Sequence, residues 1–231
     1  MQTSLCNTVS VPGYCPGDSD IQCCIKGSPT SGYYGIDMST ALSSSSASCL
    51  ASSNSFIVPR GYESVGKVDP NVCNTLRTAY NAGIKTRDVY LFPCPSCGGA
   101  SNQVSTLVSY LNNNCKSYWS GRIWLDIEGT DYWLGSTSSN QEFYKQLKDA
   151  CKSQASCGVY SSYYQWKSLF GSTSFSYGSE LPLWYADWDG SPSFSGFSSF
   201  AGWTSPYMKQ YVGDVSKCSQ GVDLNYSPFN V

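Results

Sequence analysis

Histidine is absent from all 231 residues of the chain. Its absence excludes Ser-His-Asp and Cys-His nucleophile systems, histidine general bases and the commonest zinc sites. Charged residues are also scarce, at 13%, and 14 basic against 16 acidic side chains give a net charge of −2. The lack of a basic run argues against a nucleic-acid partner. The lack of an apolar stretch of about eighteen residues argues against a membrane span.

Cysteine, in contrast, is abundant, with 12 in the chain. We interpret them as disulfides formed in an oxidising compartment, and their pairing stays open. Cys94 and Cys97 form the one Cys-x-x-Cys spacing, which we interpret as a local loop staple, with a redox site as the alternative. The chain begins without the apolar run of a signal peptide. We therefore expect a mature protein, secreted or lysosomal/phagosomal, whose signal peptide is not present in this chain.

The composition divides the chain into two parts. Residues 1–31 hold four of the cysteines and show no helical or strand periodicity. We expect a short Cys-rich N-terminal segment there that wraps and stabilises the main domain, with a minor carbohydrate-contacting module as the alternative. Residues 32–231 are long enough to bury a large core and form the main domain.

Short apolar runs in the main domain predict eight buried strands. They lie at residues 34–38, 56–61, 89–93, 123–127, 158–161, 181–186, 207–212 and 222–225. Between the earlier strands, apolar residues recur with helical spacing over 72–80, 104–111 and 143–151. This alternation predicts an α/β fold with a mainly parallel sheet, and eight strands fit an irregular (β/α) barrel of TIM type. A doubly wound open sheet is the alternative, but no glycine-rich phosphate loop follows the first strand.

The sharpest motif is Asp126-Ile127-Glu128 at the end of the fourth predicted strand. Strand side chains alternate between faces, so Trp124, Asp126 and Glu128 point together into the barrel, within about 7 Å for neighbouring members. Barrel active sites are built at this end of the strands. One carboxyl group of such a pair has a raised pKa, which makes it an acid near neutral pH, as glycoside cleavage requires.

Two further aspartates stand at predicted strand ends, Asp37 in the first strand and Asp223 in the last. The first and last strands are neighbours in a closed barrel, so we expect these side chains to lie close together. The alternative for each is a helix N-cap or a turn residue.

Aromatic residues accompany the acids. Arg60 and Tyr62, Tyr160, and the neighbours Trp184 and Tyr185 lie at the ends of further predicted strands. Sugar rings stack their apolar faces on aromatic side chains, while their hydroxyl groups need fixed polar partners. These residues therefore favour a polysaccharide groove, and either Trp184 or Tyr185 is able to face it.

An ordered set of five motifs across residues 33–226 resembles glycoside hydrolase family 25, the N-acetylmuramidase lysozymes. The motifs are Gly35-Ile36-Asp37-Met38-Ser39, Trp124-Leu125-Asp126-Ile127-Glu128, Leu181-Pro182-Leu183-Trp184-Tyr185-Ala186, Lys209-Gln210-Tyr211 and Val222-Asp223-Leu224-Asn225. The segment around Cys94 and Cys97 is similar to the eukaryotic, disulfide-containing branch of the family.

The resemblance implies five β/α units followed by three strands, and hydrolysis of the β-1,4 bond between N-acetylmuramic acid and N-acetylglucosamine in bacterial peptidoglycan. It implies Glu128 as general acid/base and Asp126 as the residue that orients and stabilises the substrate's 2-acetamido group. Asp37 and Asp223 are then supporting residues. We expect no cofactor, no metal and a monomer whose partner is the peptidoglycan glycan strand.

The resemblance also implies that Tyr62, Tyr160 and Trp184 stand at positions that contact substrate in that family.

Two other functions stay open. A chitinase-like glycosidase would need an aspartate where Trp124 stands, and a non-catalytic glycan-binding barrel would have lost an acid that this chain keeps. The sequon at Asn225 lies so close to Asp223 that we expect it to carry no glycan.

Overall fold

The computed structural model describes residues 10–11, 23–24 and 32–231. The two short pieces, β1 (Ser10–Val11) and β2 (Cys23–Cys24), pair antiparallel. The rest of the Cys-rich segment expected over residues 1–31 lies outside the described residues, so that interpretation stays a prediction.

The main domain is a mixed α/β barrel of eight strands. In order around the barrel they are β3 (Tyr33–Met38), β12 (Gln220–Ser227), β11 (Met208–Lys217), β10 (Leu183–Ala186), β9 (Ser156–Ser161), β8 (Arg122–Asp126), β7 (Val89–Leu91) and β4 (Phe56–Glu63). The pairing of β3 with β4 closes the ring. The closed barrel is therefore confirmed over the open sheet. Two short strands, β5 (Lys67–Val68) and β6 (Thr86–Arg87), pair with β4 outside this ring.

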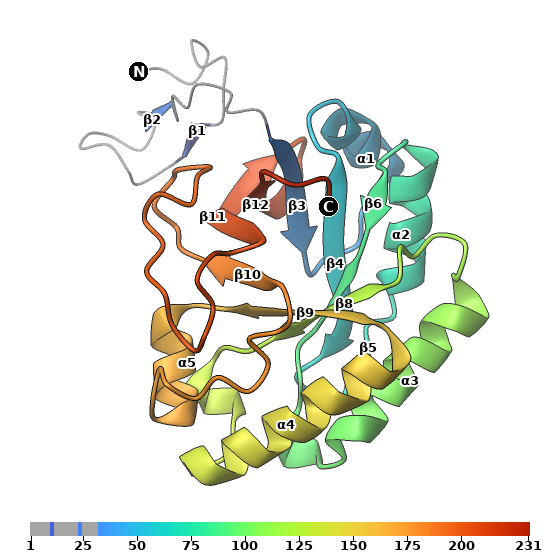
Figure 1. Ribbon diagram of the computed structural model, residues 1–231. Coiled ribbons are helices and arrows are strands. Elements are labelled where there is room, and N and C mark those ends of the chain that lie inside the picture. The colour runs from blue at the N-terminus through green and yellow to red at the C-terminus, as the bar shows by residue number, and fades with distance from the viewer. Residues whose placement is uncertain (1–9, 12–22, 25–31) are drawn as a thin grey trace.

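Five α-helices in the described part of the chain each follow a barrel strand. They are α1 (Ser44–Ala51), α2 (Val72–Asn81), α3 (Ala100–Asn114), α4 (Thr137–Gln154) and α5 (Tyr163–Phe170). Figure 1 shows them placed around the outside of the barrel, from α1 at the upper right to α5 at the lower left. The three helices expected from periodicity, α2, α3 and α4, are confirmed. Two 3-10 turns, η2 (Pro95–Cys97) and η3 (Thr130–Tyr132), follow β7 and β8.

The last strand departs from the expected parallel arrangement. β12 pairs antiparallel with both β11 and β3, while the other barrel strands pair parallel with their neighbours. The reason is local: only Cys218 and Ser219 separate β11 from β12, and both have positive φ, 56° and 59°. A two-residue hairpin turn of this kind joins antiparallel strands and cannot make a parallel crossover.

The core has two layers. Inside the barrel lie Phe56, Val58, Trp124, Tyr160, Trp184 and Met208. A larger cluster, which includes Ile123, Leu125 and Ile127, packs between the barrel and the helices. The alternation predicted for residues 123–127 is therefore confirmed. Gly158 makes room for the inner layer, because a Cβ atom there would come 2.3 Å from the Trp124 ring.

Four disulfides join described residues: Cys49–Cys218, Cys73–Cys115, Cys94–Cys97 and Cys151–Cys157. Cys94 and Cys97 thus form the expected loop staple, which closes the turn η2. In the part of the chain that the structure describes, no helix combines the length and apolar character needed to cross a membrane.

Candidate active site

Four carboxylates meet where the parallel strands end. Asp37 comes from β3, Asp126 from β8, Glu128 from the loop after β8 and Asp223 from β12, and all four line one cavity of about 250 Å³. Asp223 lies near the start of β12, not at its end as expected. Because β12 is antiparallel, its start lies at the edge where β3 ends, and Asp223 pairs in register with Asp37. The expected proximity therefore holds for a different reason.

Asp37 and Asp223 are held by amide groups. Gln210 Nε2 donates to Asp37 Oδ1 at 3.0 Å and to Asp223 Oδ2 at 3.2 Å. Asn225 Nδ2 donates to Asp37 Oδ1 at 2.7 Å, and the backbone N–H of Asp214 donates to Asp223 Oδ1 at 2.6 Å. These neutral donors stabilise negative charge on the pair without adding a positive group.

Aromatic donors fix the orientation of the two amides. The Tyr160 hydroxyl and the Trp188 indole N–H donate to Gln210 Oε1 at 2.8 and 2.7 Å. The Trp184 indole N–H donates to Asn225 Oδ1 at 2.7 Å. With each carbonyl oxygen occupied by a donor, each NH₂ group is directed at the carboxylates. Asn225 has no exposed surface, which agrees with the expectation that its sequon is unused.

Asp126 holds a buried carboxylate oxygen that no donor among the described residues reaches. It is buried, and its Oδ1 has no hydrogen-bond partner. Burial raises the pKa of Asp126 well above its ordinary value, and the negative charges of Glu128 and Asp37 raise it further. Two charges on Asp126 and Glu128 at once are therefore unfavourable, and the pair holds a proton at pH values where an exposed aspartate has lost it.

Glu128 is more accessible than Asp126 but shares its environment. Burial raises the pKa of Glu128, and the charge of Asp223 adds to the effect. Its backbone is fixed, because the Trp133 indole N–H donates to the Glu128 carbonyl at 2.9 Å and the next amide, of Gly129, donates to Gln165 Oε1 at 3.1 Å. A raised pKa on a positioned carboxyl group is what a general acid requires.

Raised pKa values are also found at Asp37, Asp223, Tyr90 and Tyr160. Burial raises the pKa of Asp37 well above its ordinary value, with the charge of Asp223 second, and burial raises the pKa of Asp223 as well. Burial is the main cause of the pKa values of Tyr90 and Tyr160, which are raised well above the ordinary value, and the Tyr160 hydroxyl donates to Gln210 Oε1.

Four of the expected site residues do not line this cavity. Tyr62 and Tyr185 belong to the layer between barrel and helices, and Tyr185 packs edge-to-face on Phe197 at 5.1 Å. For Tyr62 the cause is a break in the register of β4 and β7 between Arg60 and Tyr62, which a simple alternation cannot anticipate. Neither residue lines the cavity, so a substrate contact of either stays a prediction, and of the pair Trp184 and Tyr185 it is Trp184 that faces the cavity.

Arg60 and Trp124 lie near the site without lining it. Arg60 Nε bonds Asp69 Oδ2 at 2.9 Å, and its Nη2 donates to the Ser39 carbonyl at 3.3 Å, so its guanidinium ties loops together. Trp124 is fully buried inside the barrel, and its indole N–H donates to Asp88 Oδ2 at 3.1 Å.

Four lining residues were not among the sequence candidates: Tyr90, Trp188, Gln210 and Asp214. The alternation of β7 was sufficient to place Tyr90 inside, and Gln210 belongs to one of the family-like motifs. Trp188 comes two residues after β10, so it also lies at a strand end, where barrel active sites are built. Asp214 carries no such signal, because it depends on the irregular register of β11 with β12.

A closed α/β barrel with an Asp-x-Glu pair at a strand end, beside two further acids, is the kind of site in which glycoside hydrolases cleave sugar bonds. The family model described as "Lysozyme-like protein 1" matches residues 29–211. "Probable GH family 25 lysozyme 2" of Dictyostelium discoideum is 45% identical over 196 residues, 84% of this chain and 90% of the relative. "Probable GH family 25 lysozyme 5" of the same organism is 41% identical over 198 residues, 84% and 90% of the two chains.

Among solved structures, the Clostridium perfringens spore cortex lytic enzyme SleM has a TM-score of 0.68 at 21% identity, over 88% of this chain and 69% of SleM. That likeness shows a shared fold. The family model and the Dictyostelium relatives show the family: the chain belongs to the glycoside hydrolase family 25 lysozymes.

Proposed function

We propose that this protein is a lysozyme that hydrolyses the β-1,4 bond between N-acetylmuramic acid and N-acetylglucosamine in bacterial peptidoglycan. The observation that carries the proposal is the pair Asp126 and Glu128, which lies in one cavity with Asp37 and Asp223 and has raised pKa values on both members. Such a pair is able to supply one protonated and one ionised carboxyl group at pH values above the ordinary pKa range of carboxyl groups.

The first step uses the form of the pair in which Glu128 carries the proton and Asp126 the negative charge, although burial raises the pKa of Asp126 further above its ordinary value than that of Glu128. Glu128 gives its proton to the glycosidic oxygen while the bond from that oxygen to the anomeric carbon breaks. The carbonyl oxygen of the substrate's own acetamido group forms a bond to the anomeric carbon, which gives an oxazolinium ion. Asp126 accepts the acetamido N–H and stabilises the positive charge.

In the second step a water molecule attacks the anomeric carbon and gives a proton to the Glu128 carboxylate, while the bond to the acetamido oxygen breaks. The product keeps the β configuration, and Glu128 is again an acid. Direct displacement by water is the alternative and would invert the anomeric carbon. NMR of the fresh product distinguishes them: we expect the β anomer first, and an initial α anomer would exclude the retaining route.

Digestion of purified bacterial wall tests the function itself. We expect new reducing ends on N-acetylmuramic acid, identified by borohydride reduction and mass spectrometry of the fragments. New ends on N-acetylglucosamine would overturn the bond assignment. Chitin oligomers run in parallel would be cut faster than wall by a chitinase-like enzyme, and binding to wall without new reducing ends would indicate a glycan-binding barrel.

The setting of the enzyme forms part of the proposal. The disulfides that join described residues, such as Cys49–Cys218, support an oxidising compartment, and we propose a secreted or lysosomal location. The placement of Asp37, Asp126 and Glu128 at or just after the carboxyl ends of β3 and β8 supports the TIM-type description of the barrel. We propose that the enzyme acts as a monomer and that the protein side chains alone carry the steps above.

A further inference from the structure

The loop after β10 is held to the neighbouring strand β11 at several points. Lys209, only 1% exposed, directs its Nζ to Asp189 Oδ2 at 2.7 Å and to Asp187 Oδ2 at 3.5 Å. The backbone N–H groups of Asp187 and Gly190 donate to the carbonyls of Gln210 and Tyr211, both at 3.0 Å. Ion pairs with Lys209 and backbone hydrogen bonds to β11 therefore fix the loop.

Trp188 lies in the middle of this loop and its orientation is set from two directions. Its indole N–H donates to Gln210 Oε1 at 2.7 Å, the same oxygen that accepts from Tyr160. Its six-membered ring lies on Gly213, where an added Cβ atom would come within 2.2 Å of Trp188 Cζ2. Only glycine allows the indole to approach the backbone this closely.

The fixed indole still presents a large surface. Trp188 is 46% exposed, and it lines the cavity that holds Asp126 and Glu128. The loop holds this indole in place with ion pairs from the buried Lys209 to two carboxylates, Asp187 and Asp189. An aromatic surface that is rigid before binding loses little side-chain entropy when a ligand packs on it.

We propose that Trp188 is a stacking platform for one pyranose ring of the glycan chain, next to the bond that Glu128 cleaves. The inference rests on the proposed function and names a specificity-determining residue for it. The apolar C–H face of a neutral N-acetylhexosamine matches the indole, while its hydroxyl and acetamido groups face the carboxylates and phenols of the cavity. Lys209 and Gln210 are positioning residues that act through Trp188.

The test compares Trp188→Ala with Tyr164→Ala in steady-state digestion of soluble wall fragments. Tyr164 is 79% exposed, follows β9 and is not among the residues that line the cavity, so it controls for loss of an exposed ring. We expect Trp188→Ala to raise KM by roughly 10-fold, the scale of one aromatic stacking contact, with kcat lowered less. We expect Tyr164→Ala to change KM by less than about 2-fold.

Two further variants keep the test decisive if Trp188→Ala disturbs the loop. Trp188→Phe keeps a ring but loses the N–H that bonds Gln210, so we expect a KM nearer to the wild type than to the alanine variant. Lys209→Met releases the loop while leaving the indole in the chain, so we expect KM to rise although Trp188 is present.

An unchanged KM in a folded Trp188→Ala variant would overturn the platform, and so would equal effects of Trp188→Ala and Tyr164→Ala. Failure of the inference is distinguishable from failure of the function. If the wild type releases reducing ends and Glu128→Gln does not, the function stands whatever Trp188 does. If the wild type releases none, binding of the fragments to wild type and Trp188→Ala by calorimetry still measures the platform.

Discussion

The two ends of the barrel each bury an aspartate, and the two are compensated in opposite ways. Asp88, at the start of β7, accepts from the Trp124 indole at 3.1 Å and lies near the positive charges of Arg122 and Arg87. Burial raises the pKa of Asp88 to about 6, and these three groups oppose the rise. Asp126, at the end of the next strand, has an unpaired oxygen and negative neighbours that add to the effect of burial.

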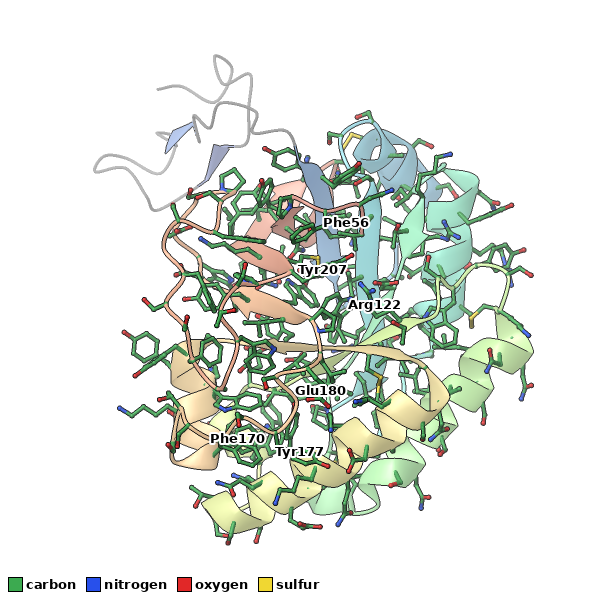
Figure 2. The ribbon with its side chains drawn as sticks, in the orientation of Figure 1. Phe56, Arg122, Phe170, Tyr177, Glu180 and Tyr207 are labelled. Atoms are coloured by element: carbon green, nitrogen blue, oxygen red, sulfur yellow. A yellow bond between two sulfur atoms is a disulfide. The ribbon has the colours of Figure 1, made fainter. Side chains whose placement is uncertain are left out.

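The difference follows from what β8 carries along its length. Its first residue, Arg122, places its guanidinium 5.3 Å from the Trp124 ring and 5.1 Å from the Tyr207 ring, and Figure 2 shows Arg122 and Tyr207 together at the centre of the view. Its last residue is Asp126. One end of the strand therefore neutralises a buried acid, and the other leaves an acid uncompensated where substrate is proposed to enter. Burial is thus opposed by favourable partners at Asp88 and reinforced by negative neighbours at Asp126, for which we propose a role in the chemistry.

Replacement of Glu128 or Asp126 is expected to have the largest effect on turnover. Glu128→Gln should lower turnover on bacterial wall by at least ~100-fold, because the leaving oxygen loses its proton donor. Asp126→Asn should also cripple turnover, since the acetamido N–H loses its charged acceptor. The matched control is Asp88→Asn, equally buried but at the other end, which should change turnover less than about 3-fold.

These rates are measured by wall clearing, with circular dichroism and thermal unfolding to show that each variant folds. Near-normal clearing by folded Glu128→Gln would remove that residue from its role. If Asp126→Asn only weakened binding, Asp126 would be a substrate clamp. A loss of turnover in Asp88→Asn as large as in Asp126→Asn would break the comparison between the two ends.

The pH dependence of the free energy of unfolding should show the titration of Asp88. The pKa of Asp88 is about 6 in the folded protein and 3.8 as the ordinary value, so the folded state binds more protons between these pH values. The free energy of unfolding therefore falls as pH rises from about 4 to about 6, by roughly 3 kcal/mol from this group. Asp37, Asp126, Glu128 and Asp223, all with raised pKa values, contribute in the same direction.

Asp88→Asn should therefore be more stable than the wild type above about pH 6 and show a shallower fall between pH 4 and 6. Urea unfolding at several pH values measures this. The asparagine still accepts from the Trp124 indole, so the variant changes the charge and keeps the hydrogen bond. An unchanged slope would mean that Asp88 does not titrate in this range.

Arg122→Gln should have the smallest effect. It removes the positive charge that opposes the raised pKa of Asp88 and the cation–π contacts with Trp124 and Tyr207. We expect a loss of about 1 kcal/mol in the free energy of unfolding at pH 7, a smaller loss at pH 4.5 where Asp88 is neutral, and turnover close to wild type. An equal loss at both pH values would leave only the ring contacts as its role.

Much of the barrel was accessible from the sequence because each strand buries alternate residues. The runs at 123–127 and 34–38 gave strand positions and, for β8, the correct inner and outer faces. Two helices escaped detection. α1 is rich in serine and begins at the Ser43 N-cap, and α5 is a short helix that begins at the Ser162 N-cap, so neither has a long apolar period.

The sequence revealed the acids of the site and two of its aromatic residues, Tyr160 and Trp184. Asp37, Asp126, Glu128 and Asp223 share strand ends, which one sequence is sufficient to reveal. The amides that hold them depend on contacts between residues far apart in the chain: 173 positions separate Gln210 from Asp37, and 188 separate Asn225 from it. Strand register and bulges decide these contacts, and periodicity does not encode them.

The central claim is that the pair Asp126 and Glu128 holds a proton at pH values where ordinary carboxyl groups have lost theirs. Carbon-13 NMR of protein labelled at the Asp and Glu carboxyl carbons, with Asp126→Asn and Glu128→Gln for assignment, measures it directly. The account predicts that the Asp126–Glu128 pair titrates in two separate steps, with at least one step well above the ordinary range of pH 4 to 4.5. Titration of both groups together at about pH 4 would contradict it.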